Sequence, residues 1–217
     1  DAFAQQRLVV DLVSRRLPKS YGYDPLRDIQ VITPAKQGPL GTRELNRLLQ
    51  GKLNPPERGK GEATLMGRTL REGDKVMQIR NNYDIIWQQP DGTAGTGIFN
   101  GDMGIIEMLD PGSKTIQVRF EEKLATYSFE NQDQLEHAYA VTVHKSQGSE
   151  FEAVVMPLER RHPKLHYRNL LYTAVTRARK LLIMTGQKET VYAMVQNNRR
   201  TLRYTNQKEM LQEMCDE

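Results

Sequence analysis

The stretch YAVTVHKSQGSEFEAVVMPL, residues 139–158, decides the fold that we predict for this chain. Its ends, YAVTVH and AVVMPL, are short apolar runs, which are typical of strands buried on both faces of a parallel sheet. The loop between them carries His144, Lys145, Gly148 and Glu150, more polar and charged groups than a simple connection needs. Ligands of open parallel sheets bind beyond the carboxyl ends of the strands, so this loop is a candidate site.

The sequence on both sides of this stretch continues an α/β pattern. Apolar residues recur at helical spacing in four segments, and two further short apolar runs indicate strands. We expect Pro18 and the following stretch KSYGYDP (19–25) to end the first helix, and Thr42 to cap the second with its side chain. The predicted helices cover 3–17, 42–53, 168–178 and 188–198, and the further strands cover 28–34 and 180–186.

The middle of the chain has a different texture. After the polar stretch NPPERGKGEA, residues 54–63, the apolar residues alternate with polar ones in short runs separated by turns. Such closely spaced strands of period two favour a small antiparallel barrel or sandwich. The run DGTAGTG, residues 91–97, predicts a mobile loop within it. We therefore predict one α/β domain over 1–67 and 138–217, interrupted by a small β-barrel over 68–137.

Composition limits the class of protein. Of 217 residues, 38% are hydrophobic and 27% are charged, which suits a globular domain. No apolar run approaches the roughly 20 residues of a membrane span, so no membrane partner is expected. A net charge of +4 weakly favours a polyanionic partner. The lone Cys215 predicts a reducing, cytoplasmic setting, and the absence of an initiating Met leads us to expect a fragment of a longer chain.

Three segments are predicted to converge on one rim of the sheet: TPAKQGPLGT at 33–42, HKSQGSEF at 144–151 and TRARK at 176–180. Arg177 is either a solvated helix end or a guanidinium aimed at a phosphate, which its planar fork fits. Glu150 is either a surface carboxylate paired with Lys145 or an acceptor for ribose hydroxyls. Thr142, His144 and Lys145 carry the groups that donate to a nucleic-acid backbone.

Several chemistries are not expected of this chain. It contains no Gly-x-x-x-x-Gly-Lys-Ser/Thr loop and no Asp-Glu pair after an apolar strand. Without a phosphate cradle and a magnesium ligand, the chain alone is expected not to hydrolyse a nucleotide. Four histidines spread along the chain, without a carboxylate at ligand spacing, predict no metal site.

The order of these parts resembles a known family. YAVTVHKSQGSEF (139–151) and NLLYTAVTRARKLLIMTG (169–186) resemble motifs V and VI of superfamily 1 DNA helicases. DIQVITPAKQGPLGTRELNRLLQGKLNP (28–55) resembles the motif IV region of the RecD-like branch, the exodeoxyribonuclease V alpha-subunit family. GDKVMQIRNNYD (73–84) and GIFNGDMGIIEMLD (97–110) resemble the start of its inserted barrel. The resemblance covers essentially the whole chain.

This resemblance implies a fold and an activity. The fold is the second RecA-like motor domain (domain 2A), with an inserted SH3-like barrel (domain 2B). The activity is ATP-dependent 5′ to 3′ movement along single-stranded DNA, with ATP and Mg²⁺ bound against an N-terminal motor domain of the same polypeptide. Other exonuclease V subunits are further implied partners.

The resemblance also assigns residues to roles. Arg177 matches the arginine finger, and Gly148 with Glu150 matches the part of motif V that contacts the nucleotide. Thr142, His144 and Lys145 are assigned to the DNA backbone. For the basic residue of motif IV the candidates are Lys36, which we place in the nucleotide site, and Arg43.

Two other interpretations stay open at the level of sequence. One is a non-catalytic module that binds single-stranded nucleic acid, which the missing phosphate loop favours. The other is the helicase portion of a conjugative relaxase, which shares these motifs. An upstream phosphate loop followed by an Asp-Glu strand would indicate a motor, and an upstream nicking domain would indicate a relaxase.

Overall fold

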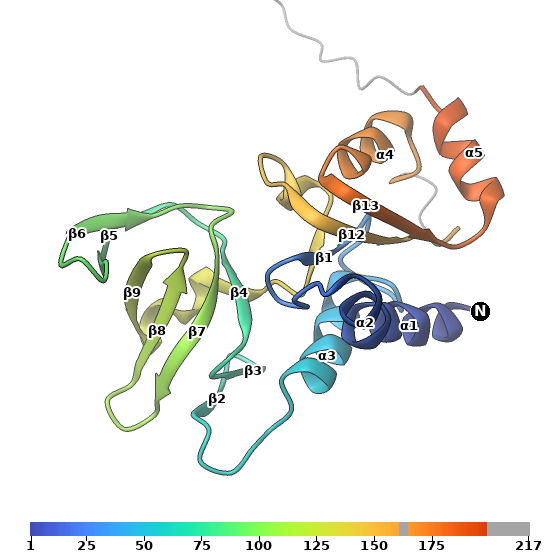
Figure 1. Cartoon of the computed structure of the whole chain (residues 1–217). Coiled ribbons are helices and arrows are strands. Elements are labelled where there is room, and N and C mark those ends of the chain that lie inside the picture. Colours follow the sequence, from blue (N-terminus) through green and yellow to red (C-terminus); the bar gives the residue numbers. More distant parts are fainter. Residues whose placement is uncertain (161–164, 199–217) are drawn as a thin grey trace, which may run out of the picture.

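A computed structural model of the chain describes residues 1–160 and 165–198. Residues 29–33 and segments of 140–185 together form a parallel sheet of four strands, in the order β11-β1-β12-β13 (Figure 1). The strands are β1 (Ile29–Thr33), β11 (Ala140–Thr142), β12 (Phe151–Pro157) and β13 (Ala178–Thr185). The predicted α/β class and both apolar runs of the deciding stretch are thereby confirmed. Cys215 lies outside the described residues.

Helices cover both faces of this sheet, because successive residues of a strand point to opposite sides. On one face, Val31 and Val155 pack with α1 (Ala2–Asp11) and α3 (Thr42–Leu53). On the other face, Ile32 and Val154 pack with α4 (Arg168–Val175) and α5 (Lys188–Gln196). Strands buried on both faces explain the unbroken apolar runs in the sequence.

The first helix runs past Pro18 and ends at Gly22, within the stretch KSYGYDP that was predicted to end it. It continues from α1 through a π-helical turn, Leu12–Arg16, into α2 (Leu17–Tyr21), and Pro18 lies in the first turn of α2. Proline is tolerated there because its missing N–H would lack a helical partner in a first turn. Gly22 ends the helix instead, with a φ of 72° that favours glycine.

Two other helix boundaries also differ from the prediction. Thr42 is the first residue of α3, whereas Gly41 is its N-cap, and no side chain caps this helix. A Cβ at Gly41 would lie 2.5 Å from the carbonyl oxygen of Gln37, so the turn before α3 has room only for glycine. The helix predicted over 168–178 ends at Val175, because β13 begins already at Ala178.

The inserted segment is a seven-stranded antiparallel sheet in the order β10-β4-β7-β8-β9-β5-β6. The strands are β4 (Lys75–Gln78), β5 (Asn82–Gln88), β6 (Ala94–Ile98), β7 (Met103–Asp110), β8 (Thr115–Phe120), β9 (Lys123–Ser128) and β10 (Leu135–His137). The outer strands β10 and β6 do not pair with each other, so a closed barrel is not confirmed.

Two segments predicted to be irregular contain strands. Most of the run at 91–97 forms β6, which pairs with β5 around a turn at 89–93. Cross-strand pairing of a glycine- and threonine-rich strand explains why composition alone predicted a loop. The end of the predicted linker begins a hairpin of β2 (Glu62–Leu65) and β3 (Arg68–Arg71). The predicted domain boundary at 67/68 falls in the turn of this hairpin and stays a prediction.

A buried carboxylate joins the insertion to the α/β part. Asp74, which is 0% exposed, lies between β3 and β4. Its two oxygens are contacted by hydrogen-bonding groups from α3, from β3 and from the passage between β10 and β11. These groups are Gln50 Nε2 (2.7 Å), Asn54 Nδ2 (2.6 Å), Arg71 N (2.9 Å), His137 Nε2 (3.1 Å) and Tyr139 Oη (2.8 Å). The direction in which the insertion leaves the α/β part is therefore fixed by polar contacts.

Candidate functional site

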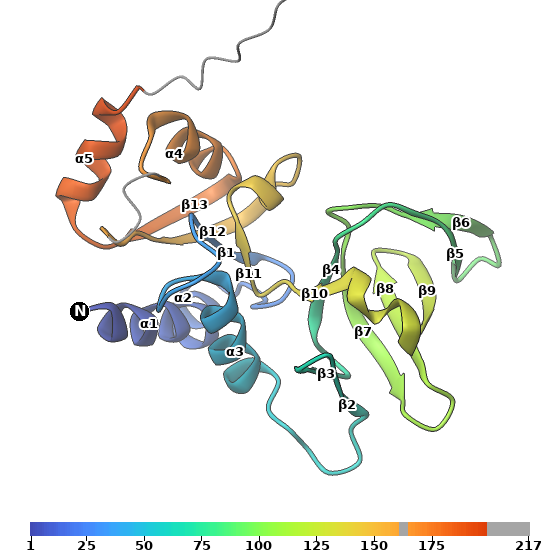
Figure 2. The same ribbon diagram turned by 180° about the vertical axis from the view of Figure 1, so that it is seen from behind.

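The predicted site residues lie at two opposite edges of the parallel sheet. Thr142 pairs with Thr33 at the carboxyl end of β1. In the register of the sheet, this end of β1 lies beside the carboxyl end of β12. Phe151, at the start of β12, lies six residues earlier along that strand, about 20 Å away at 3.3 Å per residue. The loop 143–150 thus carries the chain from the carboxyl edge back to the amino edge (Figure 2).

This arrangement corrects the prediction of one rim. The segments 33–42 and 144–151 do begin at the carboxyl edge. TRARK, in contrast, precedes β13 and pairs with the start of β12, since Ala178 is opposite Phe151. A helix that follows one parallel strand and precedes the next must return to the amino edge, which places Arg177 there.

Arg177 is bound to the loop of the deciding stretch. Its Nη1 donates to the carbonyl of Ser149 at 3.1 Å, and its own carbonyl accepts from the N–H of Phe151 at 2.8 Å. Nε donates to the carbonyl of Thr173, and Nη2 to the hydroxyl of Thr176, each at 3.1 Å. A guanidinium has five N–H groups, so two remain free for a ligand. This half-buried side chain is held in one place and is not a freely solvated helix end.

Gly148 and Glu150 flank the carbonyl that Arg177 binds. Gly148 has a φ of 86° with open space around the position of a Cβ, so backbone conformation, not crowding, favours glycine there. Glu150 is exposed and pairs with Arg179 at 3.0 Å. The predicted pairing of Glu150 with Lys145 is wrong. We call Gly148, Glu150 and Arg177 the amino-edge group.

A second group lines a small hollow at the carboxyl edge. The hollow is lined by Lys36, Thr142 and Lys145, together with Glu136 and residues of α3 and β4. Lys145 Nζ lies 2.6 Å from a carboxylate oxygen of Glu136. Burial raises the pKa of Glu136, but the hydrogen bond from Lys145 and the charges of Lys145, Lys36 and Arg68 outweigh burial, and the net pKa is lowered. We call Lys36, Thr142 and Lys145 the carboxyl-edge group.

The members of this second group differ in how accessible they are. Lys36 is exposed and lies beside Thr142 and Lys145, not beside Arg177. Thr142 is buried, and its hydroxyl accepts from the N–H of Lys145 at 3.4 Å, which leaves its own hydrogen free to donate. His144 is exposed, with Nε2 3.4 Å from the hydroxyl of Tyr167.

The sequence analysis missed the polar residues of α3 that support the carboxyl-edge group. Asn46 donates to the carbonyl of Ala140 at 2.9 Å and accepts from its N–H at 2.8 Å. Because β11 is an edge strand, this amide completes hydrogen bonds that a neighbouring strand would otherwise make. The signal was available: Asn46, Gln50 and Asn54 recur every four residues beside buried leucines, which places a polar stripe on the helix.

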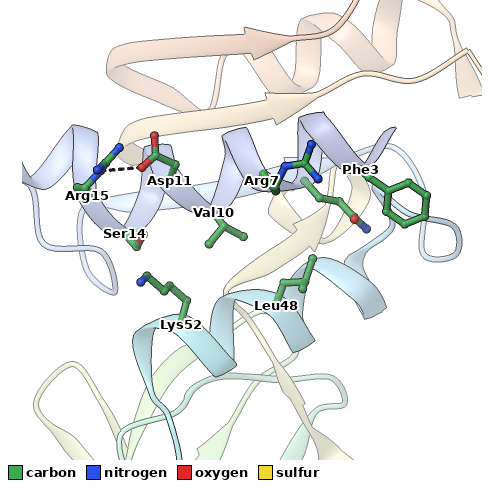
Figure 3. Close-up of a pocket in the computed structure, with 9 residues that line it drawn as sticks. Phe3, Arg7, Val10, Asp11, Ser14, Arg15, Leu48 and Lys52 are labelled. Carbon is green, nitrogen blue, oxygen red and sulfur yellow. Dashed lines mark ion pairs between the residues drawn. The ribbon is translucent and has the colours of Figure 1, made fainter. Parts of the chain in front are cut away.

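A wider groove between α1 and α3 contains no residue of either group. Figure 3 shows Arg7 and Val10 from α1 facing Leu48 and Lys52 from α3. Asp11, at its border, pairs with Arg15 at 2.8 Å. Within 1–160 and 165–198 no cluster of three His, Cys, Asp or Glu residues is arranged to hold a metal ion, and no helix there is long and apolar enough to cross a membrane.

Comparisons with known families match the two parts of the chain separately. Residues 45–120 match the model of the SH3 domain of ATP-dependent RecD-like DNA helicases. Residues 137–185 match the model of the UvrD-like helicase C-terminal domain, and this range includes Thr142, Glu150 and Arg177.

Curated relatives point to the same group of proteins. The ATP-dependent RecD2 DNA helicase of Deinococcus radiodurans is 35% identical over 158 residues, which are 73% of this chain and 20% of that protein. The RecBCD enzyme subunit RecD of Buchnera aphidicola (subspecies Schizaphis graminum) is 26% identical over 172 residues, 78% of this chain and 26% of the relative. The chain thus spans about a fifth to a quarter of the length of these relatives. Among solved structures, the Pif1 helicase from Bacteroides in complex with ADP-AlF3 and ssDNA aligns with a TM-score of 0.49 and 16% identity, over 98% of this chain and 50% of the other.

Proposed function

Since the chain is a C-terminal region of the RecD-like superfamily 1 helicases, we propose that it is the second motor domain of an ATP-dependent 5′ to 3′ DNA helicase. It works within a longer polypeptide whose N-terminal motor domain supplies the phosphate loop and the Mg²⁺ ligands. The observation that carries the proposal is the separation of the two residue groups to opposite edges of one sheet, joined by the single loop 143–150. A motor must bind its nucleotide at one place and its DNA track at another, and it must couple the two sites.

The amino-edge group forms half of the ATP site. Arg177 offers its two free N–H groups to the γ-phosphate, where a guanidinium stabilises the charge that develops during transfer. When the nucleotide binds, Glu150 releases its ion pair with Arg179 and accepts a hydrogen bond from a ribose hydroxyl. The space around the backbone at Gly148 lets the nucleotide approach closely. These residues fit one side of a nucleotide, whereas the bound Mg²⁺ would neutralise phosphate charge from the opposite domain.

The carboxyl-edge group and His144 form part of the single-stranded DNA track. Lys145 and Lys36 supply charge to phosphates, and Thr142 and His144 supply further hydrogen-bond donors. We assign Lys36 to this track and not to the nucleotide, because it lines the same hollow as Thr142 and Lys145. Movement of the loop on ATP binding would then shift the track residues, since the loop connects the two groups.

The proposal includes the division of the chain. Residues 1–67 and 138–217 are assigned to a RecA-like domain 2A, and residues 68–137 to an SH3-like domain 2B. The N-terminal motor domain is the first partner, and exonuclease V subunits are further partners of the complete protein. Neither a non-catalytic binding module nor a relaxase segment is favoured by the relatives found.

The test is Arg177→Ala in the full-length protein that contains this chain. We expect DNA-stimulated ATP hydrolysis to fall by about a thousandfold or more, the contribution of an arginine finger, with single-stranded DNA affinity within about twofold of the parent. Arg177→Lys keeps the charge but loses the fork, and should stay impaired.

The matched control is Arg47→Ala, which removes an exposed arginine of α3 that pairs with Glu44. It should leave hydrolysis unchanged. Because Arg177 also binds the carbonyl of Ser149, thermal unfolding of each variant must be compared. Normal turnover in a folded Arg177→Ala protein would disprove the assigned role.

A further inference from the structure

Two aromatic rings are exposed together on the inserted sheet. Tyr83 lies near the start of β5 and is 66% exposed, and Phe99 follows β6 and is 42% exposed. Their ring centroids are 5.6 Å apart with planes at 72°, an edge-to-face pair. Single exposed apolar residues are ordinary on protein surfaces, but two rings fixed against each other in solvent require an explanation.

The backbone around the pair is fixed by polar side chains. The N–H of Phe99 donates to Asp102 Oδ2 at 2.9 Å, and the N–H of Asn100 donates to Asn81 Oδ1 at 2.9 Å. Gly97 has a φ of 99°, and a Cβ there would lie 3.2 Å from the ring of Phe99. The rings are therefore held in place before any ligand binds, which lowers the entropy cost of binding.

The aromatic pair is connected to the proposed DNA track through hydrogen bonds. Asn82, next to Tyr83, donates to Gln134 Oε1 at 3.0 Å. Gln134 directly precedes β10, and Glu136 in β10 pairs with Lys145 of the carboxyl-edge group. Asn82, Gln134 and Glu136 thus form a chain of polar contacts between Tyr83 and Lys145.

We propose that Tyr83 and Phe99 form a base-stacking platform for single-stranded DNA, which extends the track onto the inserted sheet. The inference rests on the proposed function and adds a binding site to it. Aromatic faces stack unpaired bases without reading their sequence, as a motor requires. The polar residues near the rings are the amides Asn81, Asn82 and Asn100 and the carboxylates Asp84 and Asp102, whereas the broad patch that a protein partner buries is apolar. In a duplex the base faces are covered, so the ligand is a single strand.

The test measures binding of fluorescein-labelled oligothymidine to this chain by fluorescence anisotropy at several salt concentrations. Tyr83→Ala and Phe99→Ala should each weaken binding by about 5- to 100-fold, the range for loss of one base–aromatic stack. The slope of log affinity against log salt should not change, because no phosphate contact is lost. Lys145→Gln should instead make that slope shallower by about one unit. Tyr83→Phe should retain most of the affinity.

The control is Tyr192→Ala, which removes a tyrosine of nearly equal exposure, 65%, from α5. It should leave binding unchanged. Oligothymidine binding that is equal for the parent and both ring variants would overturn the platform and leave the motor proposal in place. No oligothymidine binding by the parent chain would overturn the platform and the assigned track together. The Tyr83, Phe99 and Tyr192 variants must show the thermal midpoint of the parent, as expected for exposed side chains.

Discussion

Replacing Asp74 by Asn should destabilise the chain strongly, although the two side chains have nearly the same shape. Both carboxylate oxygens of Asp74 accept hydrogen bonds, and the side chain is fully buried. Asparagine has one acceptor oxygen and one NH₂ group. Whichever way the amide is placed, its NH₂ must face donors that the carboxylate satisfied.

The magnitude follows from counting those donors. One oxygen accepts from Asn54 and Tyr139, and the other from Gln50, Arg71 and His137. At least two groups therefore lose an acceptor, and each buried unsatisfied donor costs about 1–3 kcal/mol. The free energy of unfolding should fall by about 2–6 kcal/mol. At about 2–3 kcal/mol per M of urea, the midpoint should fall by about 0.7–3 M.

Urea unfolding of the chain, followed by circular dichroism, is the assay. Asp84→Asn makes the same chemical change at an exposed position of β5 and should shift the midpoint by less than about 0.3 M. A second readout is pH. Burial raises the pKa of Asp74, but the hydrogen bonds and charge of His137, with those of Asn54 and Arg71, lower it overall.

A carboxyl group with a lowered folded pKa stabilises the fold above its unfolded pKa, and this stability is lost as pH falls through the folded value. The parent should therefore lose an increment of stability in acid that the Asn variant lacks. Equal urea midpoints for the parent and Asp74→Asn would refute the view that this junction is held by the carboxylate.

Three further predictions concern other parts of the chain. Burial lowers the pKa of Lys75 to about 8, below its unfolded value, so the unfolded chain binds more protons than the folded chain between pH 8 and about 10. The free energy of unfolding should therefore rise with pH across that range. Thermal melts at several pH values should show this rise for the parent and not for Lys75→Met. Gly104→Ala should cost about 1–3 kcal/mol in urea unfolding, because its Cβ would lie 2.6 Å from a carbonyl oxygen of β8. Gly51→Ala in α3, where the Cβ meets nothing within 4 Å, should instead stabilise by about 0.5–1 kcal/mol. Glu136→Gln should tighten single-stranded DNA binding and steepen its salt dependence, because Lys145 loses the carboxylate that competes with phosphate; unchanged binding would count against the assigned track.

Local patterns predicted most of the elements correctly. The strands around 139–158 were predicted because a strand that is covered on both faces is mostly apolar, and β8 was predicted because Ile116 and Val118 alternate with polar residues. The errors occurred where a neighbouring helical turn or strand changed the local secondary structure. Pro18 lies inside a helix because a π-helical turn precedes it, and β6 exists because β5 pairs with it.

The sequence by itself determined which residues are candidates for the chemistry of this chain: a guanidinium, a glycine loop, a carboxylate and a basic strand end lie in a fixed order whatever the fold. Only the tertiary structure decided where they meet. Arg177 lies at the amino edge because the helix before β13 must return the chain across the sheet, and it binds Ser149, 28 residues away in sequence. Lys36 joined Thr142 because β1 and β11 are neighbours, although more than a hundred residues separate them. The burial of Asp74 depends on partners from three separate elements, and no local pattern contains such long-range information.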